Sequence, residues 1–184
     1  GAVTLASTAA VNPGDSTAVD TTDDLAVDSV DFGGAGRQFN VQIGGTAAGD
    51  FDQLDVSAAG GVTLAGATLN VSLVGLFTPN PLVLEQYTII DNAGTDAVSG
   101  IFAGLAEGAE IIVGVSKFYI SYSGDAGGPG SGNDVVLYSQ PVVNGTGAND
   151  TLVIRGNAGT FGLTLNGGTE IFITPPAGAP INFY

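Results

Sequence analysis

The chain has 184 residues, with 18 Asp and Glu against three Lys and Arg, and a formal net charge of −15. This charge excludes nucleic acid and anionic membrane surfaces as partners, because binding to either needs basic side chains. His, Cys, Met and Trp are all missing, so imidazole and thiolate catalysis and soft metal sites are excluded as well. There is no run of about 18 apolar residues, and we therefore expect no membrane insertion.

Taken in chain order, the sequence begins with a segment, 1–31, that we expect to be extended and acidic in its second half. Beyond it, glycine and β-branched residues interrupt nearly every helical pattern, and a short, weak one is left at 102–110. Apolar residues instead alternate with polar ones, which is typical of half-buried strands. The expected strands are 39–43, 53–57, 62–65, 68–73, 84–90, 111–115, 117–122, 135–138, 152–155, 161–165 and 170–174, with glycine-rich turns between them. The sequence therefore predicts an all-β protein.

The expected strands fall into two groups, separated where Pro141 interrupts the pattern. Asn166 and Gly167 favour a tight hairpin, because both residues accept a positive φ, so the strands on either side should be antiparallel. We expect a main β domain at 32–139, a small antiparallel β module at 140–174, and a proline-rich spacer with an apolar terminal strand at 175–184.

Residues 50–138 contain four ordered blocks, DFDQLDVS, GVTLAGATLNVSLVG, YTIIDNAGTDAVSGIFAGLAEGAEIIVG and FYISYSGDAGGPGSGNDVVL. This series resembles the repetitive β-solenoid passenger segments of bacterial autotransporters and related large surface proteins. Residues 144–173 are similar to small β modules along giant secreted bacterial proteins. The resemblance implies an extracellular location at the cell surface and adhesive or structural work, with no catalytic motif. For the main domain it leaves two alternatives open, a β-solenoid like a parallel β-helix or a β-sandwich.

Three clusters of acidic and amide side chains are candidates for a metal site. Ca²⁺ prefers carboxylate and carbonyl oxygens, and calcium is the one cofactor that this composition suggests. The clusters are Asp20, Asp23 and Asp24; Asp50, Asp52 and Asp55; and Asp125, Asn133 and Asp134. Their spacing matches no EF-hand loop, and aspartates that cap turns or face solvent explain the same pattern.

Sugar binding is the alternative function. A few Tyr rings and Asn amides, together with a calcium ion, would suffice to bind a cell-surface or matrix polysaccharide. Tyr119, beside Lys117 on an expected strand, is a candidate platform for a sugar ring. The chain would then be a calcium-assisted carbohydrate-binding module of a bacterial adhesin. A hydrolase is disfavoured, because its carboxylate pair normally has pKa-tuning neighbours that this composition hardly offers.

Self-assembly is the function that the sequence favours. Open β edges template another strand unless charge, proline or a bulge blocks them, and lysine, a common blocking residue, occurs once. Strand-like apolar residues at both termini are candidate assembly residues, namely Val3, Leu5, Ile181, Phe183 and Tyr184. In the alternative, both termini pack against their own domain. We therefore expect a non-catalytic subunit of an extracellular fibre, surface layer or adhesin that partners itself.

Overall fold

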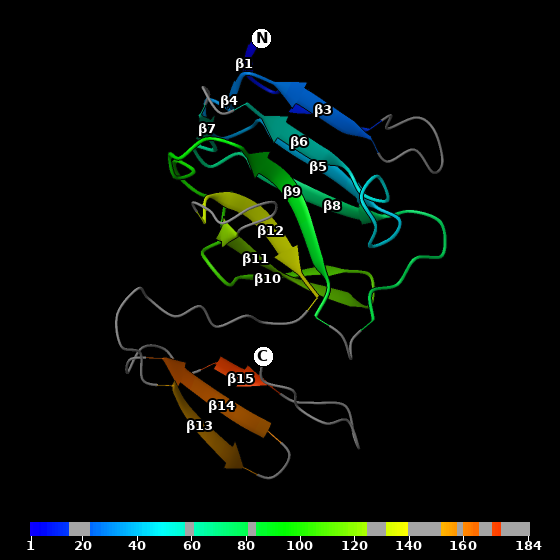
Figure 1. Cartoon of the computed structure of the whole chain (residues 1–184), viewed down its shortest axis with the longest axis vertical. Coiled ribbons are helices and arrows are strands. Elements are labelled where there is room, and N and C mark those ends of the chain that lie inside the picture. Colours follow the sequence, from blue (N-terminus) through cyan, green and yellow to red (C-terminus); the bar gives the residue numbers. More distant parts are fainter. Residues whose placement is uncertain are drawn as a thin grey trace. The chain divides into compact units, whose positions relative to one another are not determined.

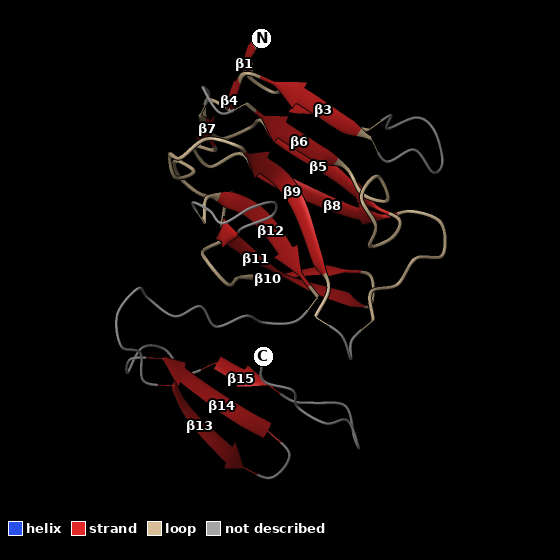
Figure 2. Cartoon of the chain, in the orientation of Figure 1, coloured by secondary structure: helices blue, strands red, loops and turns tan. Residues whose placement is uncertain are grey.

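The described part of the chain consists of strands, turns and loops. The computed structural model describes residues 1–14, 23–57, 61–80, 84–124 and 132–139, and the backbone of three later strands at 152–157, 160–165 and 171–173. The protein divides into two compact units, Gly1–Gln140 and Pro141–Tyr184. These described residues contain no helix (Figure 2), and hence none long and apolar enough to cross a membrane. The prediction of an all-β protein is confirmed.

The first nine strands are distributed over three sheets in a repeating order. Sheet A contains β1 (Ala2–Thr4), β4 (Ser29–Asp31) and β7 (Val62–Thr63); sheet B contains β2 (Ala10–Val11), β5 (Gln38–Ile43) and β8 (Thr68–Leu73); sheet C begins with β3 (Asp24–Val27), β6 (Gln53–Val56) and β9 (Gln86–Asn92). Every neighbouring pair among them is parallel. The chain therefore visits the three sheets in turn and returns to each beside the strand that it left there.

Alternating side chains explain why these segments form strands. In β5, Phe39, Val41 and Ile43 are at most 1% exposed, and the polar residues between them lie on the opposite face. Burying one such side chain contributes roughly 1.5–3 kcal/mol. Two aromatic clusters fill the interior, one of Phe32, Phe39 and Phe102, the other of Phe51, Phe77 and Phe118 around Tyr87. These rings join segments of the chain that are far apart in sequence.

The corners between sheets A and B require left-handed backbone. Gly33, between β4 and β5, has a φ of 69°. At the corresponding corners Thr8 has a φ of 67° and Ala65 a φ of 50°, which residues with a Cβ rarely adopt. Thr8 and Ala65 are therefore strained positions that the surrounding sheets hold in place.

Sheet C continues past β9 with three antiparallel strands. β12 (Asp134–Tyr138) pairs with β9, β11 (Ser116–Gly124) with β12, and β10 (Glu110–Val113) with β11. Figure 1 shows β3, β6, β9 and β12 side by side. The complete order is β10-β11-β12-β9-β6-β3, so β3 and β10 are the two edges of this sheet. Because three successive pairs are antiparallel, β10 runs opposite to β3.

The second unit is a three-stranded antiparallel sheet of β13 (Leu152–Asn157), β14 (Thr160–Leu165) and β15 (Ile171–Ile173). Phe161 of β14 lies opposite Ile173 of β15, which confirms the antiparallel pair predicted around Asn166 and Gly167. The turn residues themselves lie outside the described residues.

Two segments differ from the local structure that the sequence suggests. Residues 1–31 do not stand apart as an extended segment, because β1 to β4 lie within them and pair in sheets A, B and C. Residues 102–110, with their weak helical pattern, contain turns. The partners of the early strands are distant in sequence, as Ala2 opposite Ser29 illustrates, so no local pattern reveals them.

Candidate functional site

The first three strands, β1, β2 and β3, each form the edge of a different sheet. Among the described residues β1 pairs only with β4, β2 only with β5, and β3 only with β6. An edge strand presents unpaired backbone N–H and C=O groups that can pair with another chain. The edge strands β1, β2 and β3 are therefore a candidate site for strand addition.

The hydrogen bonds between an edge strand and its partner show which amides of the edge strand face away from that partner. The Leu5 amide donates to the Asp31 carbonyl oxygen of β4 at 3.0 Å. Because successive residues of a strand direct their amides to opposite sides, the Thr4 amide faces away from β4.

The same reasoning applies to β3. The Val27 carbonyl oxygen accepts a hydrogen bond from the Ser57 amide at 3.0 Å, on the β6 side. The backbone groups of Ala26, one residue earlier, therefore face away from β6. Both Thr4 and Ala26 have exposed side chains as well, so nothing described covers these positions.

The N-terminal assembly residues predicted from sequence pack against their own unit. Val3 lies opposite Val30 in the β1–β4 pair and is half-buried, and Leu5 is 6% exposed and belongs to the core. The backbone edge of β1 is thus available to a partner, whereas the Leu5 side chain is not. Ile181, Phe183 and Tyr184 lie outside the described residues.

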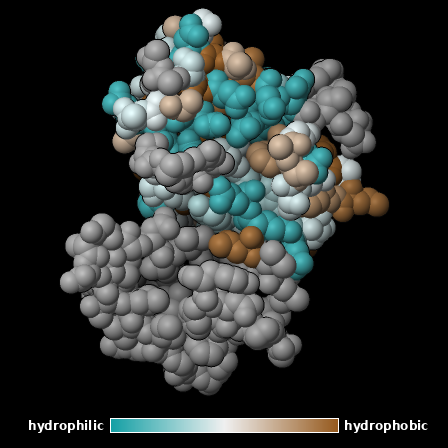
Figure 3. All heavy atoms as spheres, in the orientation of Figure 1, coloured by the Kyte–Doolittle hydropathy of each residue, from teal (hydrophilic) through white to brown (hydrophobic). Residues whose placement is uncertain are grey.

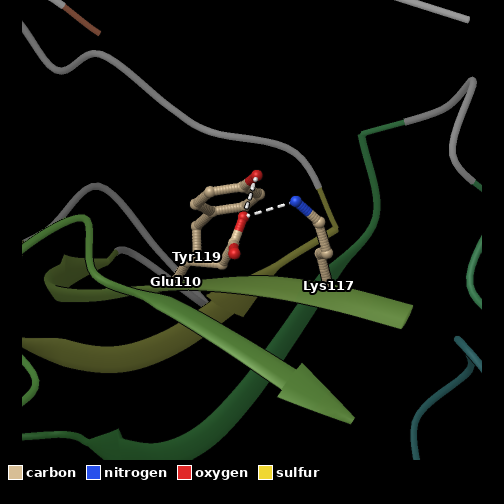
Figure 4. Close-up of polar contacts among 3 residues, drawn as sticks. All are labelled: Glu110, Lys117 and Tyr119. Atoms are coloured by element: carbon tan, nitrogen blue, oxygen red, sulfur yellow. Dashed lines mark hydrogen bonds and ion pairs between the residues drawn. The ribbon is translucent and has the colours of Figure 1, made fainter. Parts of the chain in front are cut away.

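The other edge of sheet C, β10, lies beside the one lysine of the chain. The Lys117 Nζ and the Tyr119 hydroxyl donate to the same carboxylate oxygen of Glu110, at 2.9 and 3.1 Å (Figure 4). The Lys117 hydrogen bond lowers the pKa of Glu110, and burial together with Glu110 raises the pKa of Tyr119 to about 12. Lys117 is thus paired, and Tyr119, the candidate sugar platform, is held by Glu110.

Apolar side chains are exposed at β10 and its turn. Ile112 is 64% and Val115 94% exposed. Other exposed apolar residues are scattered over the first unit, and on the face in Figure 3 hydrophilic areas separate the hydrophobic ones. Among the described residues β10 pairs only with β11, so one side of its backbone has no strand partner there, and exposed apolar side chains lie beside it.

Sheet B carries a ladder of asparagines on its outer face. The Asn40 amide donates to Asn12 Oδ1 at 2.5 Å, and the Asn70 amide donates to Asn40 Oδ1 at 2.8 Å. Sequence reasoning missed this ladder. The signal that would have revealed it is the recurrence of Asn at positions 12, 40 and 70, once with each strand of sheet B.

A groove of about 250 Å³ lies over this ladder, with Asp52 in its wall. Asp52 is 2% exposed, and its carboxylate accepts hydrogen bonds from the amides of Asp23 at 3.1 Å and Gln42 at 2.9 Å. Burial raises the pKa of Asp52. The backbone hydrogen bonds from Gln42, Asp23 and Gly14 lower this pKa, but burial outweighs them. Asp52 therefore ties together the segments after β2, before β3 and within β5.

Two carboxylates face each other on the outer side of sheet C. Asp55 and Asp91 lie directly opposite in the β6–β9 pair. Burial raises the pKa of both, and the charges of Asp24 and Asp91 raise that of Asp55 further, as Asp134 does for Asp91. Like charges placed opposite each other destabilise a sheet, so protonation of this pair stabilises it.

The predicted calcium cluster at Asp50, Asp52 and Asp55 is dispersed in the structure. Asp50 accepts a hydrogen bond from the Ala47 amide at 3.2 Å, Asp52 is surrounded by backbone amides, and Asp55 faces Asp91. Of the described residues, no three acidic side chains are grouped so that they would hold a metal ion.

Asp23, Asn133 and Asp134, from the other two predicted clusters, form hydrogen bonds with backbone groups. Asp23 accepts a hydrogen bond from the Asp24 amide at 2.9 Å, and Asp134 accepts one from the Asn92 amide at 2.8 Å. The Asn133 side-chain amide donates to three carbonyl oxygens, those of Asn92, Gly94 and Asp96. These side chains fasten loops to strands. Asp20 and Asp125 lie outside the described residues.

The chain matches no protein-family model, no curated protein and no solved structure. The resemblance of residues 50–138 to autotransporter passengers stays a prediction. The edge strands, the asparagine ladder and the paired carboxylates are the features from which a function can be inferred.

Proposed function

We propose that the protein is a non-catalytic structural subunit of an extracellular or cell-surface assembly, and that its copies join by β-strand addition. The observation that carries this proposal is that β1, β2 and β3, the strands of one turn, are edge strands of three different sheets. Each backbone hydrogen bond added there contributes roughly 0.5–1.5 kcal/mol. An interface that engages several edges at once is correspondingly more stable than one that engages a single strand.

We propose further that the first unit is a short β-solenoid. The registers support this, since β4 lies beside β1 with Ala2 opposite Ser29, and β7 lies beside β4 with Val30 opposite Val62. Sheets B and C repeat the pattern with parallel pairs, whereas sandwiches are built mainly from antiparallel pairs. The end of a β-solenoid exposes unpaired strand edges wherever no other segment covers its last coil.

Strand β10 of a second copy is the described strand that best suits β3. The two strands are opposite edges of one sheet and run in opposite directions, so copies related by translation would pair them as antiparallel neighbours. Leu25 on β3 and Ile112 on β10 are exposed apolar residues available to such a contact. A contact between two different surfaces does not close on itself and produces a filament.

The charge of the chain opposes this association. At −15, copies repel one another unless salt screens them, and the screening length is about 10 Å at 0.1 M salt. We therefore expect assembly to strengthen as ionic strength rises.

Proline at an outward-facing amide tests the proposal. The Thr4 and Ala26 amides face away from their partner strands, so proline there removes a donor that the described contacts of the unit do not use. We expect the Thr4→Pro, Ala26→Pro double variant to keep its circular dichroism spectrum but to sediment as a monomer. The matched Thr4→Ala, Ala26→Ser variant should assemble like the wild type. Equal assembly of the proline variant contradicts the proposal.

A further inference from the structure

Among the described residues, the outer face of sheet B differs in charge from the outer face of sheet C. It presents amide and hydroxyl side chains, namely Gln38, Asn40 and Gln42 of β5, Thr68, Asn70 and Ser72 of β8, and Asn12 after β2. We call this set the amide face. It contains no charged side chain, in a chain whose net charge is −15. The outer side of sheet C carries Asp24, Asp55 and Asp91 by comparison.

The groove of about 250 Å³ lies on the amide face. It is lined by Asn12, Asn40, Gln42, Asn70 and Ser72 of this face and, beside them, by Gly14, Val41, Asp52 and Val71. Its volume is below the roughly 300–1,000 Å³ of pockets that enclose a drug-sized molecule. It is therefore suited to one ring of a longer polymer that continues over the neighbouring amides.

One hydrogen-bonding group of a residue that lines the groove lacks a partner among the described residues. Gln42 Oε1 is buried and accepts no hydrogen bond from any described residue. A buried acceptor without a partner is costly, and a rotation of the Gln42 side chain that brings Oε1 to the groove would let a ligand hydroxyl satisfy it. The carboxylate of Asp52, in the wall of the groove, would repel an anionic ligand.

We propose that the amide face binds a neutral polysaccharide, with one sugar ring in the groove and its hydroxyls hydrogen-bonded to Gln42, Asn40 and Asn70. Sugar hydroxyls both donate and accept, as the amides do, and an uncharged polymer avoids repulsion by the acidic chain. No aromatic ring belongs to the amide face, so a single copy binds weakly. An assembly that repeats the face would gain affinity through multivalency.

The test measures retention of the full-length protein on insoluble neutral polysaccharides (amorphous cellulose, chitin, β-1,3-glucan) and on anionic polygalacturonate. We expect retention on at least one neutral polymer and none on polygalacturonate. Gln42→Glu, which places a negative charge in the groove, should weaken binding by about tenfold or more. Gln86→Glu adds the same charge on the exposed part of β9 and should bind within about twofold of the wild type.

Ser72→Asp provides a second variant at an exposed position, in case Gln42→Glu does not fold. The proposal is overturned if no neutral polymer retains the protein, if polygalacturonate retains it equally, or if folded groove variants bind like the wild type. If the groove variants lose self-association while retention on the polymer is unchanged, the amide face is an interface between copies and the proposal is likewise wrong.

Discussion

The Asn70 side-chain amide donates to Oδ1 of Asn40 at 2.8 Å, across the parallel pair of β5 and β8. Asn40 donates in turn to Asn12, so one line of amides crosses sheet B from β8 through β5 to the residue that follows β2. A slip of one residue would turn these amides toward the core and expose Phe39 and Val41. The ladder and the burial of Phe39 and Val41 therefore favour the same register of β5 and β8.

Asn40 is the central member of the ladder, and its removal should destabilise the first unit. Asn40→Ala loses one donated and one accepted hydrogen bond, and we expect the free energy of unfolding to fall by about 1–2 kcal/mol. Equilibrium urea unfolding measures this loss. Gln86→Ala, which removes an exposed amide outside the ladder, should change stability by less than about 0.5 kcal/mol. Equal effects of the two substitutions would show that the ladder adds no stability.

The strained corner at Ala65 predicts a stabilising substitution. Left-handed backbone costs a residue with a Cβ roughly 1–2 kcal/mol, and glycine loses about 0.5–1 kcal/mol through its greater freedom when unfolded. With a φ of 50° at Ala65, Ala65→Gly should therefore stabilise the protein by about 0.5–1 kcal/mol. Ala67→Gly is the matched control, because Ala67 is fully buried and φ there is not positive, so this change should destabilise. A lower melting temperature for Ala65→Gly would refute the strain argument.

Buried carboxyls predict greater stability in mild acid. Burial raises the pKa of Asp52, Asp55 and Asp91 above the ordinary value of 3.8. A carboxyl with a raised pKa binds its proton more tightly when folded, so its stabilising effect is present at low pH and is lost as the pH rises through the folded-state pKa. We therefore expect a higher melting temperature at pH 4.5 than at pH 7.5. Glu110, whose pKa Lys117 lowers, acts in the opposite direction but is solvent-screened.

The Asp55→Asn variant tests the source of this pH dependence. It removes one of the two opposed charges, and the difference in melting temperature between pH 4.5 and pH 7.5 should shrink. Asp96→Asn, at an exposed carboxylate, should leave the difference as in the wild type. A wild-type protein that is less stable at pH 4.5 would contradict the account of all three buried carboxyls.

The C-terminal tail offers a test of which strand is donated. Residues 181–184 are apolar and strand-like in sequence and are the alternative donor to β10. If β10 is the donor, deletion of these four residues leaves assembly intact, and Ile112→Pro on β10 prevents it. Sedimentation of both variants distinguishes the two donors. Loss of assembly on deletion alone would assign the donor role to the tail.

Local patterns predict the hairpin and each strand from β5 to β15, and they miss the short strands β1 to β4. β5, β8 and β11 alternate visibly, and the antiparallel pair of β14 and β15 follows from the turn residues between them. β2 and β4 are two or three residues long and become strands only through parallel pairing with distant segments. Length and alternation carry no information about such partners.

Proximity in sequence is a poor guide to the candidate sites. Asp50, Asp52 and Asp55 are close in sequence but have separate partners. Asp52 accepts hydrogen bonds from backbone amides, and Asp55 faces Asp91 of β9. The asparagine ladder shows the converse, because its members are distant in sequence and adjacent in sheet B. Because this chain returns repeatedly to the same sheets, candidate sites are better found by comparing residues at equivalent positions of neighbouring strands.

The most direct test of self-assembly is sedimentation velocity of the full-length protein from low to high micromolar concentration, at low and at raised salt, with electron micrographs of the same samples. We predict species that grow with concentration and salt, that appear as filaments, and that the Thr4→Pro, Ala26→Pro variant does not form. A single species with the mass of one chain under every condition would contradict the account.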